Sequence, residues 1–171
     1  ESQGKALVRE PYLHTVVTCG GLLSAAGSEE QRAAHISTLA EGGSQWAFAF
    51  AEESSGYDFG AITTQAKREG DHYILSGRKI AVMNGHAADQ LIVSALVEAD
   101  DVTSLSLFIV PANQSGIARQ AFTAVDGSRG AVVNFDGVTV PASDMLGEAG
   151  AGAAHIATAL NHSIIALGGE S

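Results

Sequence analysis

Hydrophobic and polar residues follow helical spacing near both ends of this chain and strand spacing in the middle. Residues 1–27 carry apolar side chains every three or four positions, which predicts helix with a break at Pro11. A second helix is predicted after Ser28, because Ser28 and Gln31 form the sequence pattern of a capping box. Helical spacing returns over 150–167, which predicts a third helix.

From Gln45 onward the apolar residues alternate with period two, and Gly-containing turns separate the segments. Many short strands at this spacing favour an antiparallel barrel or a sandwich over a parallel sheet. The pattern alone leaves both architectures open. The predicted strands are 45–51, 61–69, 72–76, 78–83, 90–97, 104–110, 117–125 and 131–140.

The composition is that of a globular protein, with 46% hydrophobic and 16% charged residues among 171. This length provides a real core for one domain, or one and a fraction. No apolar run approaches the roughly 18–20 residues of a membrane span, and no signal peptide is recognised at the start. A single cysteine, Cys19, precludes an internal disulfide and fits a reducing compartment. We therefore expect a cytoplasmic protein.

The net charge of −10 disfavours non-specific binding to nucleic acid or to an anionic membrane. An anionic ligand would need local cations. The six histidines share no ligand spacing with one another or with Cys19, so no metal site is predicted. The basic residues available for an anion, none of which the sequence assigns to a site, are Lys67, Arg68, Arg78, Lys79, Arg119 and Arg129.

Three stretches of the chain carry a more specific signal: Glu52–Asp58, Gly77–Asp89 and Phe135–Pro141. Together they resemble the middle domain of the acyl-CoA dehydrogenase family. In that family a strand ends in Thr-Glu-Pro before a Gly/Ser turn and Asp, and a second strand leads into an Asn-Gly turn and Ala-Asp. The third stretch is Phe135–Pro141, which matches a family strand that ends in Val-Pro. The residues kept in the first two stretches are Glu52, Gly56, Asp58, Gly77, Lys79, Asn84, Gly85, Ala88 and Asp89.

The resemblance covers nearly the whole chain and resolves the choice of architecture. It implies a mainly β middle domain, a small antiparallel β-barrel, flanked by α-helices. The expected division is the end of an N-terminal helical domain at 1–43, the β-barrel domain at 44–150, and the start of a C-terminal helical domain at 151–171.

The resemblance also implies an activity and a cofactor. Members of the family bind FAD and carry out α,β-dehydrogenation of an acyl-CoA thioester, in which the flavin supplies the redox chemistry. Electron-transferring flavoprotein is the expected electron acceptor. The expected assembly is a homo-oligomer, or a hetero-oligomer with another acyl-CoA dehydrogenase subunit.

By the same resemblance, two strand ends lie side by side against the flavin ring. Several expected side chains have changed there: Thr is replaced by Ala51, Ser by Tyr57, Trp by Ala81 and Thr by Met83. Each lost hydrogen bond is worth about 0.5–1.5 kcal/mol, and the lost indole removes a stacking surface. The predicted cofactor-binding residues are Phe48, Phe50, Ala51, Gly56, Tyr57, Ala81 and Met83.

No catalytic residue is predicted, because most of the family carries the catalytic base in the C-terminal helical domain. A minority places it early in the first C-terminal helix, where this chain has Asn161 and His162. Two hypotheses therefore remain. The chain belongs either to an acyl-CoA dehydrogenase that binds its own FAD, or to a flavin-deficient structural subunit of a hetero-oligomeric acyl-CoA dehydrogenase, similar to the small subunits of pimeloyl-CoA-type dehydrogenases.

Overall fold

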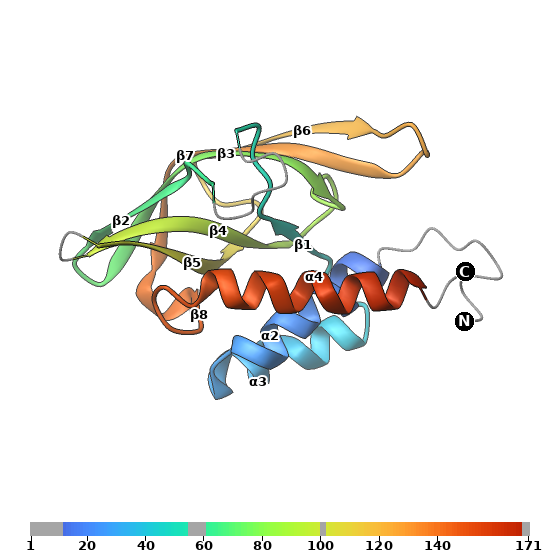
Figure 1. The fold of residues 1–171 in the computed structure, drawn as a ribbon, viewed down its shortest axis with the longest axis horizontal. Coiled ribbons are helices and arrows are strands. Elements are labelled where there is room, and N and C mark those ends of the chain that lie inside the picture. Colours follow the sequence, from blue (N-terminus) through green and yellow to red (C-terminus); the bar gives the residue numbers. More distant parts are fainter. Residues whose placement is uncertain (1–11, 55–60, 100–101, 169–171) are drawn as a thin grey trace.

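Helical segments lie near both ends of the chain and pack on one side of the sheet (Figure 1). The computed structural model describes residues 12–54, 61–99 and 102–168. Pro11, the predicted helix break, lies outside them. Consecutive glycines at positions 20 and 21 do not end the first helical segment, because both keep helical backbone angles. The helices are η1 (Leu13–Gly20), α2 (Gly21–Ala26), α3 (Glu29–Ala40) and α4 (Gly152–Gly168).

The predicted capping box begins α3. The Gln31 backbone N–H donates to Ser28 Oγ at 3.2 Å, and the Ser28 N–H donates to Gln31 Oε1 at 3.0 Å. The Gln31 amide nitrogen also donates to the carbonyls of Ser143 and Met145, at 2.8 and 2.9 Å. One side chain therefore both starts the helix and ties it to the backbone at Ser143 and Met145.

The strands form one sheet in the order β6-β7-β3-β2-β4-β5-β8, with β1 paired to β4. The predicted mainly β fold with flanking helices is confirmed, although the sheet is not closed and the pairs β1·β4 and β2·β4 are parallel. The strands are β1 (Trp46–Ala49), β2 (Gln65–Glu69), β3 (His72–Met83), β4 (Gln90–Ala99), β5 (Val102–Pro111), β6 (Ile117–Thr123), β7 (Arg129–Pro141) and β8 (Met145–Leu146), with a short 3₁₀ turn, η2 (Ala142–Asp144), before β8.

The predicted strands 72–76 and 78–83 are one strand, β3, so the prediction of a break at Gly77 is wrong. The pairing of β3 with β7 shifts register there and continues. A β-carbon at Gly77 would collide with Thr64, so the glycine allows the preceding segment to pack closely against the strand. Glycine here marks a bulge and a close approach, and the ladder runs through it.

The sheet folds over at β2, so that β3 and β7 lie opposite β4 and β5 (Figure 1). A first hydrophobic cluster fills the space between these two halves, with Leu75, Val93 and Phe108 among its members. A second cluster lies between the outer face of β4 and β5 and the helices, and includes Leu23 and Ile109. Both faces of β4 and β5 are therefore buried, which explains their nearly continuous apolar sequence.

Candidate functional site

The two segments predicted to lie together do so. The Ile80 backbone N–H donates to the Ala51 carbonyl at 2.9 Å, which joins the segment just after β1 to β3. The register of β3 against β7 shifts between Lys79 and Val82, and Ala81 has φ = 49° within this bulge. A left-handed conformation is unfavourable for a residue with a β-carbon, so the bulge is strained. The side-by-side arrangement that the resemblance requires is confirmed.

The predicted cofactor-binding residues that the structure describes form two groups. Phe48 and Phe50 lie in or against the second hydrophobic cluster, whereas Ala51, Ala81 and Met83, which we call the outward group, belong to neither cluster and are half-buried or exposed. Phe48 is only 6% exposed and belongs to the cluster that faces the helices. The Phe50 ring stacks on it, with centroids 4.7 Å apart, and is half-buried. Ala81 is exposed, and Met83 is half-buried.

The remaining predicted residues are placed as follows. Ala51 is half-buried and lies two residues past the end of β1. Gly56 and Tyr57 lie outside the described residues, so the structure gives no position for them.

The outward group has side chains whose chemistry suits the face of a flavin ring but not its polar edge. Ala51, Ala81 and Met83 present small or apolar side chains, which an isoalloxazine face can lie against. None of the three side chains can donate a hydrogen bond. Polar contacts to a ring at this surface would therefore come from backbone groups.

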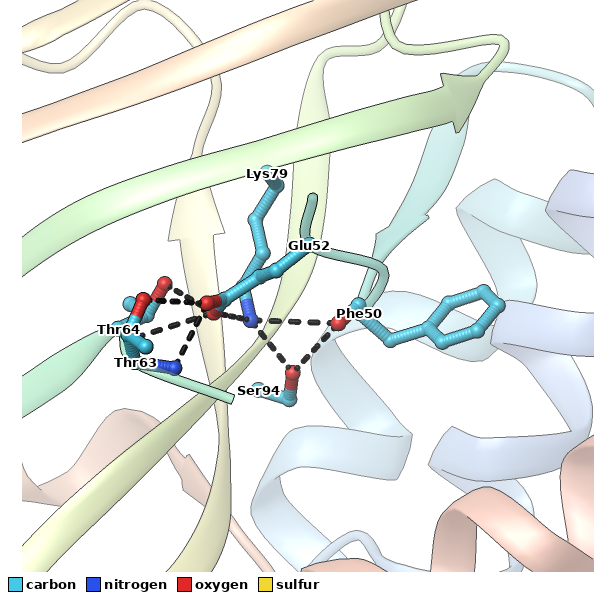
Figure 2. Close-up of polar contacts among 6 residues, drawn as sticks. All are labelled: Phe50, Glu52, Thr63, Thr64, Lys79 and Ser94. Carbon is cyan, nitrogen blue, oxygen red and sulfur yellow. Dashed lines mark hydrogen bonds and ion pairs between the residues drawn. The ribbon is translucent and has the colours of Figure 1, made fainter. Parts of the chain in front are cut away.

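A buried polar cluster connects the two segments, and we call it the Lys79 cluster: Phe50, Glu52, Thr63, Thr64, Lys79 and Ser94 (Figure 2). The Lys79 side chain is fully buried. Its ammonium donates to Glu52 Oε1 at 2.8 Å, to Ser94 Oγ at 2.9 Å and to the Phe50 carbonyl at 3.3 Å. All three ammonium protons thus have acceptors, as a buried lysine requires.

The Glu52 carboxylate is held from two sides in this cluster. Besides Lys79, it accepts hydrogen bonds from Thr63 and Thr64, each through both its N–H and its hydroxyl, at 2.6–3.0 Å. Burial opposes the charged carboxylate, but the hydrogen bonds from Lys79 and the two threonines outweigh it and lower the pKa of Glu52 to about 2. Glu52 is therefore ionised near neutral pH and is a poor candidate for a general base.

The Lys79 ammonium experiences the opposite balance. Burial lowers the pKa of Lys79 to about 8, while the hydrogen bond and the charge of Glu52 act to raise it. Near neutral pH the lysine remains mostly protonated and pairs with Glu52. Because the side chain is fully buried, it is not available to bind a CoA thioester, for which the sequence had left it as a candidate.

A second polar contact holds the far end of the same stretch of β3. Asn84, with φ = 61°, is buried and lies just past the strand. Its amide nitrogen donates to the Trp46 carbonyl at 3.3 Å and to Thr15 Oγ1 at 3.4 Å. The stretch between Lys79 and Asn84, which contains the bulge, is thus anchored at both ends, once to the end of β1 and once to β1 and η1.

An open pocket of about 410 Å³ lies beside the cluster. At its rim, Arg78 and Glu53 approach within 4.0 Å, and both side chains are exposed. A pair this exposed contributes little to stability, so either residue is free to rearrange around a ligand. The pocket is lined by Glu52, Glu53, Ser54, Thr63, Arg78 and Ile80.

Two negative findings concern the described residues alone. Within them, no group of three or more His, Cys, Asp or Glu side chains is placed to hold a metal ion. In the same part of the chain, no helix has the length and apolar character needed to cross a membrane.

The sequence carried one readable signal for the Lys79 cluster that the predictions did not use. Tyr73, Leu75 and Lys79 share one face of β3 by simple alternation, and the first two are core residues. A lysine on an inward position needs a buried partner. That partner, Glu52, is 27 residues away on a turn, and no local pattern links the two.

Comparisons with known proteins agree with the geometry. The family model of the acyl-CoA dehydrogenase middle domain matches residues 47–138. An acyl-CoA dehydrogenase of Bacillus subtilis (strain 168) is 38% identical over 137 residues, which cover 78% of this chain and 36% of that protein. The short-chain-specific acyl-CoA dehydrogenase of Clostridium acetobutylicum is 32% identical over 138 residues, with the same coverage of 78% and 36%. The chain thus spans about a third of the length of these relatives.

Solved structures with the same fold include two dehydrogenases. Butyryl-CoA dehydrogenase from Megasphaera elsdenii has a TM-score of 0.84 at 29% identity, covering 94% of this chain and 42% of that one. The steroid ACAD Tcur3481-Tcur3483 has a TM-score of 0.83 at 31% identity, covering 94% of this chain and 43% of that one. The similarity therefore includes the helices that precede and follow the strands in the chain as well as the strands themselves.

Proposed function

The chain belongs to the acyl-CoA dehydrogenase family, and we propose that it forms the flavin-facing β part of an FAD-dependent acyl-CoA dehydrogenase. The observation that carries this proposal is the hydrogen bond between Ile80 and Ala51, which places the two predicted flavin-contacting segments side by side. FAD, when bound, would accept a hydride from the β-carbon of the acyl-CoA. The chain's own part is to present the apolar surface of Ala51, Ala81 and Met83 to the ring.

The wider properties of the complete protein are proposals of the same kind. We propose the division into 1–43, 44–150 and 151–171, electron-transferring flavoprotein as electron acceptor, and an oligomer of acyl-CoA dehydrogenase subunits. A cytoplasmic location is supported by the lone Cys19, which is buried and unpaired by any disulfide.

A second candidate function is favoured by one specific observation. The outward side chains at 51, 81 and 83 supply no hydrogen-bond donor and no large aromatic surface, although the family resemblance leads us to expect Thr, Trp and Thr there. A flavin-deficient subunit of a hetero-oligomeric dehydrogenase would have such a surface. One similar structure, the steroid ACAD, carries a paired name, Tcur3481-Tcur3483.

One experiment separates the two candidates. The polypeptide encoded by the complete gene is purified alone and together with a co-expressed partner subunit, and the visible spectrum of each preparation is recorded. A yellow protein without the partner supports a self-sufficient dehydrogenase. A colourless protein that becomes yellow only with the partner supports the structural subunit, and no flavin in either preparation refutes both.

A matched pair of variants tests whether the outward surface faces the flavin. Met83→Thr restores a hydroxyl, whereas Met83→Val has nearly the same shape without one. One additional hydrogen bond corresponds to about 2- to 10-fold tighter FAD binding. We expect that gain for Met83→Thr over Met83→Val in a fluorescence-quenching titration, and equal affinities would remove position 83 from the flavin contact.

A further inference from the structure

We propose that Ser94 and Lys79 are positioning residues, which set the spacing between the Ala51 and Ala81 segments and so the surface offered to the flavin. This inference rests on the proposed function and adds residues that do not themselves face the ligand. Ser94 lies on β4 and is fully buried. Its hydroxyl accepts from the Lys79 ammonium at 2.9 Å and donates to the Phe50 carbonyl at 3.4 Å.

The argument begins at the end of β1. Regular pairing of β1 with β4 stops at Ala49, so the ladder with β4 does not hold the next residues. The Phe50 carbonyl instead accepts hydrogen bonds from two side chains, Lys79 and Ser94. Immediately afterwards the Ala51 carbonyl accepts from the Ile80 N–H. Beyond Ala49, hydrogen bonds from side chains therefore hold the backbone in place of ladder hydrogen bonds to β4 (Figure 2).

The Lys79 ammonium is also linked to the Ala81 segment, because Lys79 and Ala81 belong to the same strand, β3. Lys79 is two residues before Ala81, and the strand changes register against β7 between Lys79 and Val82, so Ala81 lies within the bulge. A bulge has fewer ladder bonds to define its position, and the strained Ala81 conformation persists only if its surroundings hold it. Lys79 on one side and Asn84 on the other supply that constraint. Loosening the Lys79 end should therefore shift the outward group without unfolding the sheet.

Ser94 offers the mildest test, because a matched control is available on the adjacent strand. Ser106, on β5, is also fully buried and accepts a hydrogen bond from the Gly150 N–H at 3.0 Å. Ser94→Ala and Ser106→Ala remove the same group from equally buried positions, but only the first touches the Lys79 cluster. A general loss of stability should affect both variants similarly.

The experiment uses the complete gene product in the form, alone or with its partner subunit, that binds flavin. Amide hydrogen exchange at Ile80 is measured by mass spectrometry on flavin-free protein, and the FAD dissociation constant by fluorescence quenching. We expect Ser94→Ala to speed exchange at Ile80 and to weaken FAD binding about 3- to 10-fold, and Ser106→Ala to change each by less than about twofold.

Equal behaviour of the two variants would overturn the inference while leaving the proposed function intact. Faster exchange in Ser94→Ala with unchanged FAD affinity would show that the spacing does not matter to the flavin, and would also overturn it. Absence of FAD binding by the unmodified protein in either form would instead refute the proposed function, and the inference with it.

Discussion

The ion pair between Lys79 and Glu52 makes the sharpest prediction for stability. Both side chains are almost fully buried, at 0% and 2% exposure, with the charged atoms 2.8 Å apart. Lys79→Met keeps most of the volume and removes the charge, so the cavity contribution is small. Loss of one partner from a buried pair costs about 3–5 kcal/mol, because the other charge is left uncompensated. The hydrogen bonds from Thr63 and Thr64 to Glu52 remain, so we expect a value near the lower end, about 3 kcal/mol.

Urea unfolding monitored by tryptophan fluorescence is a suitable assay, because Trp46 is the single tryptophan and is buried. For a chain of this size a loss of about 3 kcal/mol corresponds to a decrease in Tm of roughly 6–12 °C. Glu52→Gln is measured as well, together with the double variant. In that variant neither charge is stranded, so its loss should be smaller than the sum of the single losses by about 2 kcal/mol.

An exposed ion pair on β2 provides the control. Lys67 and Glu69 are 3.7 Å apart, and the lysine side chain is 80% exposed. Lys67→Met should change the free energy of unfolding by less than about 0.5 kcal/mol. If Lys79→Met had an equally small effect, or if the losses for Lys79→Met and Glu52→Gln simply added in the double variant, the buried pair would not exist in solution.

Three further predictions concern pH, thiol reactivity and backbone strain. The folded-state pKa of Glu52, about 2, is below its unfolded value, so the carboxylate contributes about 3 kcal/mol of stability above about pH 4.5, and this contribution is lost as the pH falls through 2. Between pH 5 and pH 3, the free energy of unfolding in urea should therefore decrease less for Glu52→Gln than for the unmodified chain. Burial raises the pKa of the Cys19 thiol, so a colorimetric thiol reagent should react slowly with native protein and rapidly in urea. Ala81→Gly should raise the free energy of unfolding by up to about 1 kcal/mol, because relief of the strain at φ = 49° exceeds the entropy cost of glycine; a lower free energy of unfolding in urea would contradict the strained bulge.

Local sequence patterns predicted the helices and strands well where residues close together in the sequence determine the structure. The capping box of Ser28 and Gln31 is one such case, since both partners lie within a single helical turn. The strand at 61–69 was predicted too long for a related reason. Thr63 and Thr64 direct their N–H groups to the Glu52 carboxylate, so the ladder of β2 begins only at Gln65. Alternation in the sequence gives no sign of a side chain that competes for backbone donors.

The sequence predicted which segments form the candidate site, but it did not predict the buried Lys79 cluster that holds them. The sequence motifs around Ala51 and Ala81 indicated which segments lie together, and the hydrogen bond from the Ile80 N–H to the Ala51 carbonyl confirms this arrangement. The pairing of Lys79 with Glu52 and Ser94 depends on how β1, β3 and β4 come together, which alternation within one strand cannot specify. The left-handed backbone at Ala81 was equally hidden, because alanine gives no reason to expect it.

Three polar residues that carry the family resemblance are buried, whereas two residues that depart from it are half-buried or exposed. Glu52, Lys79 and Asn84 match the family pattern, and all three are buried polar groups with hydrogen-bond partners inside the fold. Ala51 and Ala81 depart from it and lie on the outward side. Losing a buried partner would destabilise the protein with or without a flavin, whereas the outward side chains matter only if a ligand is there. The matching residues are therefore evidence for the fold, and the flavin question depends on the outward surface.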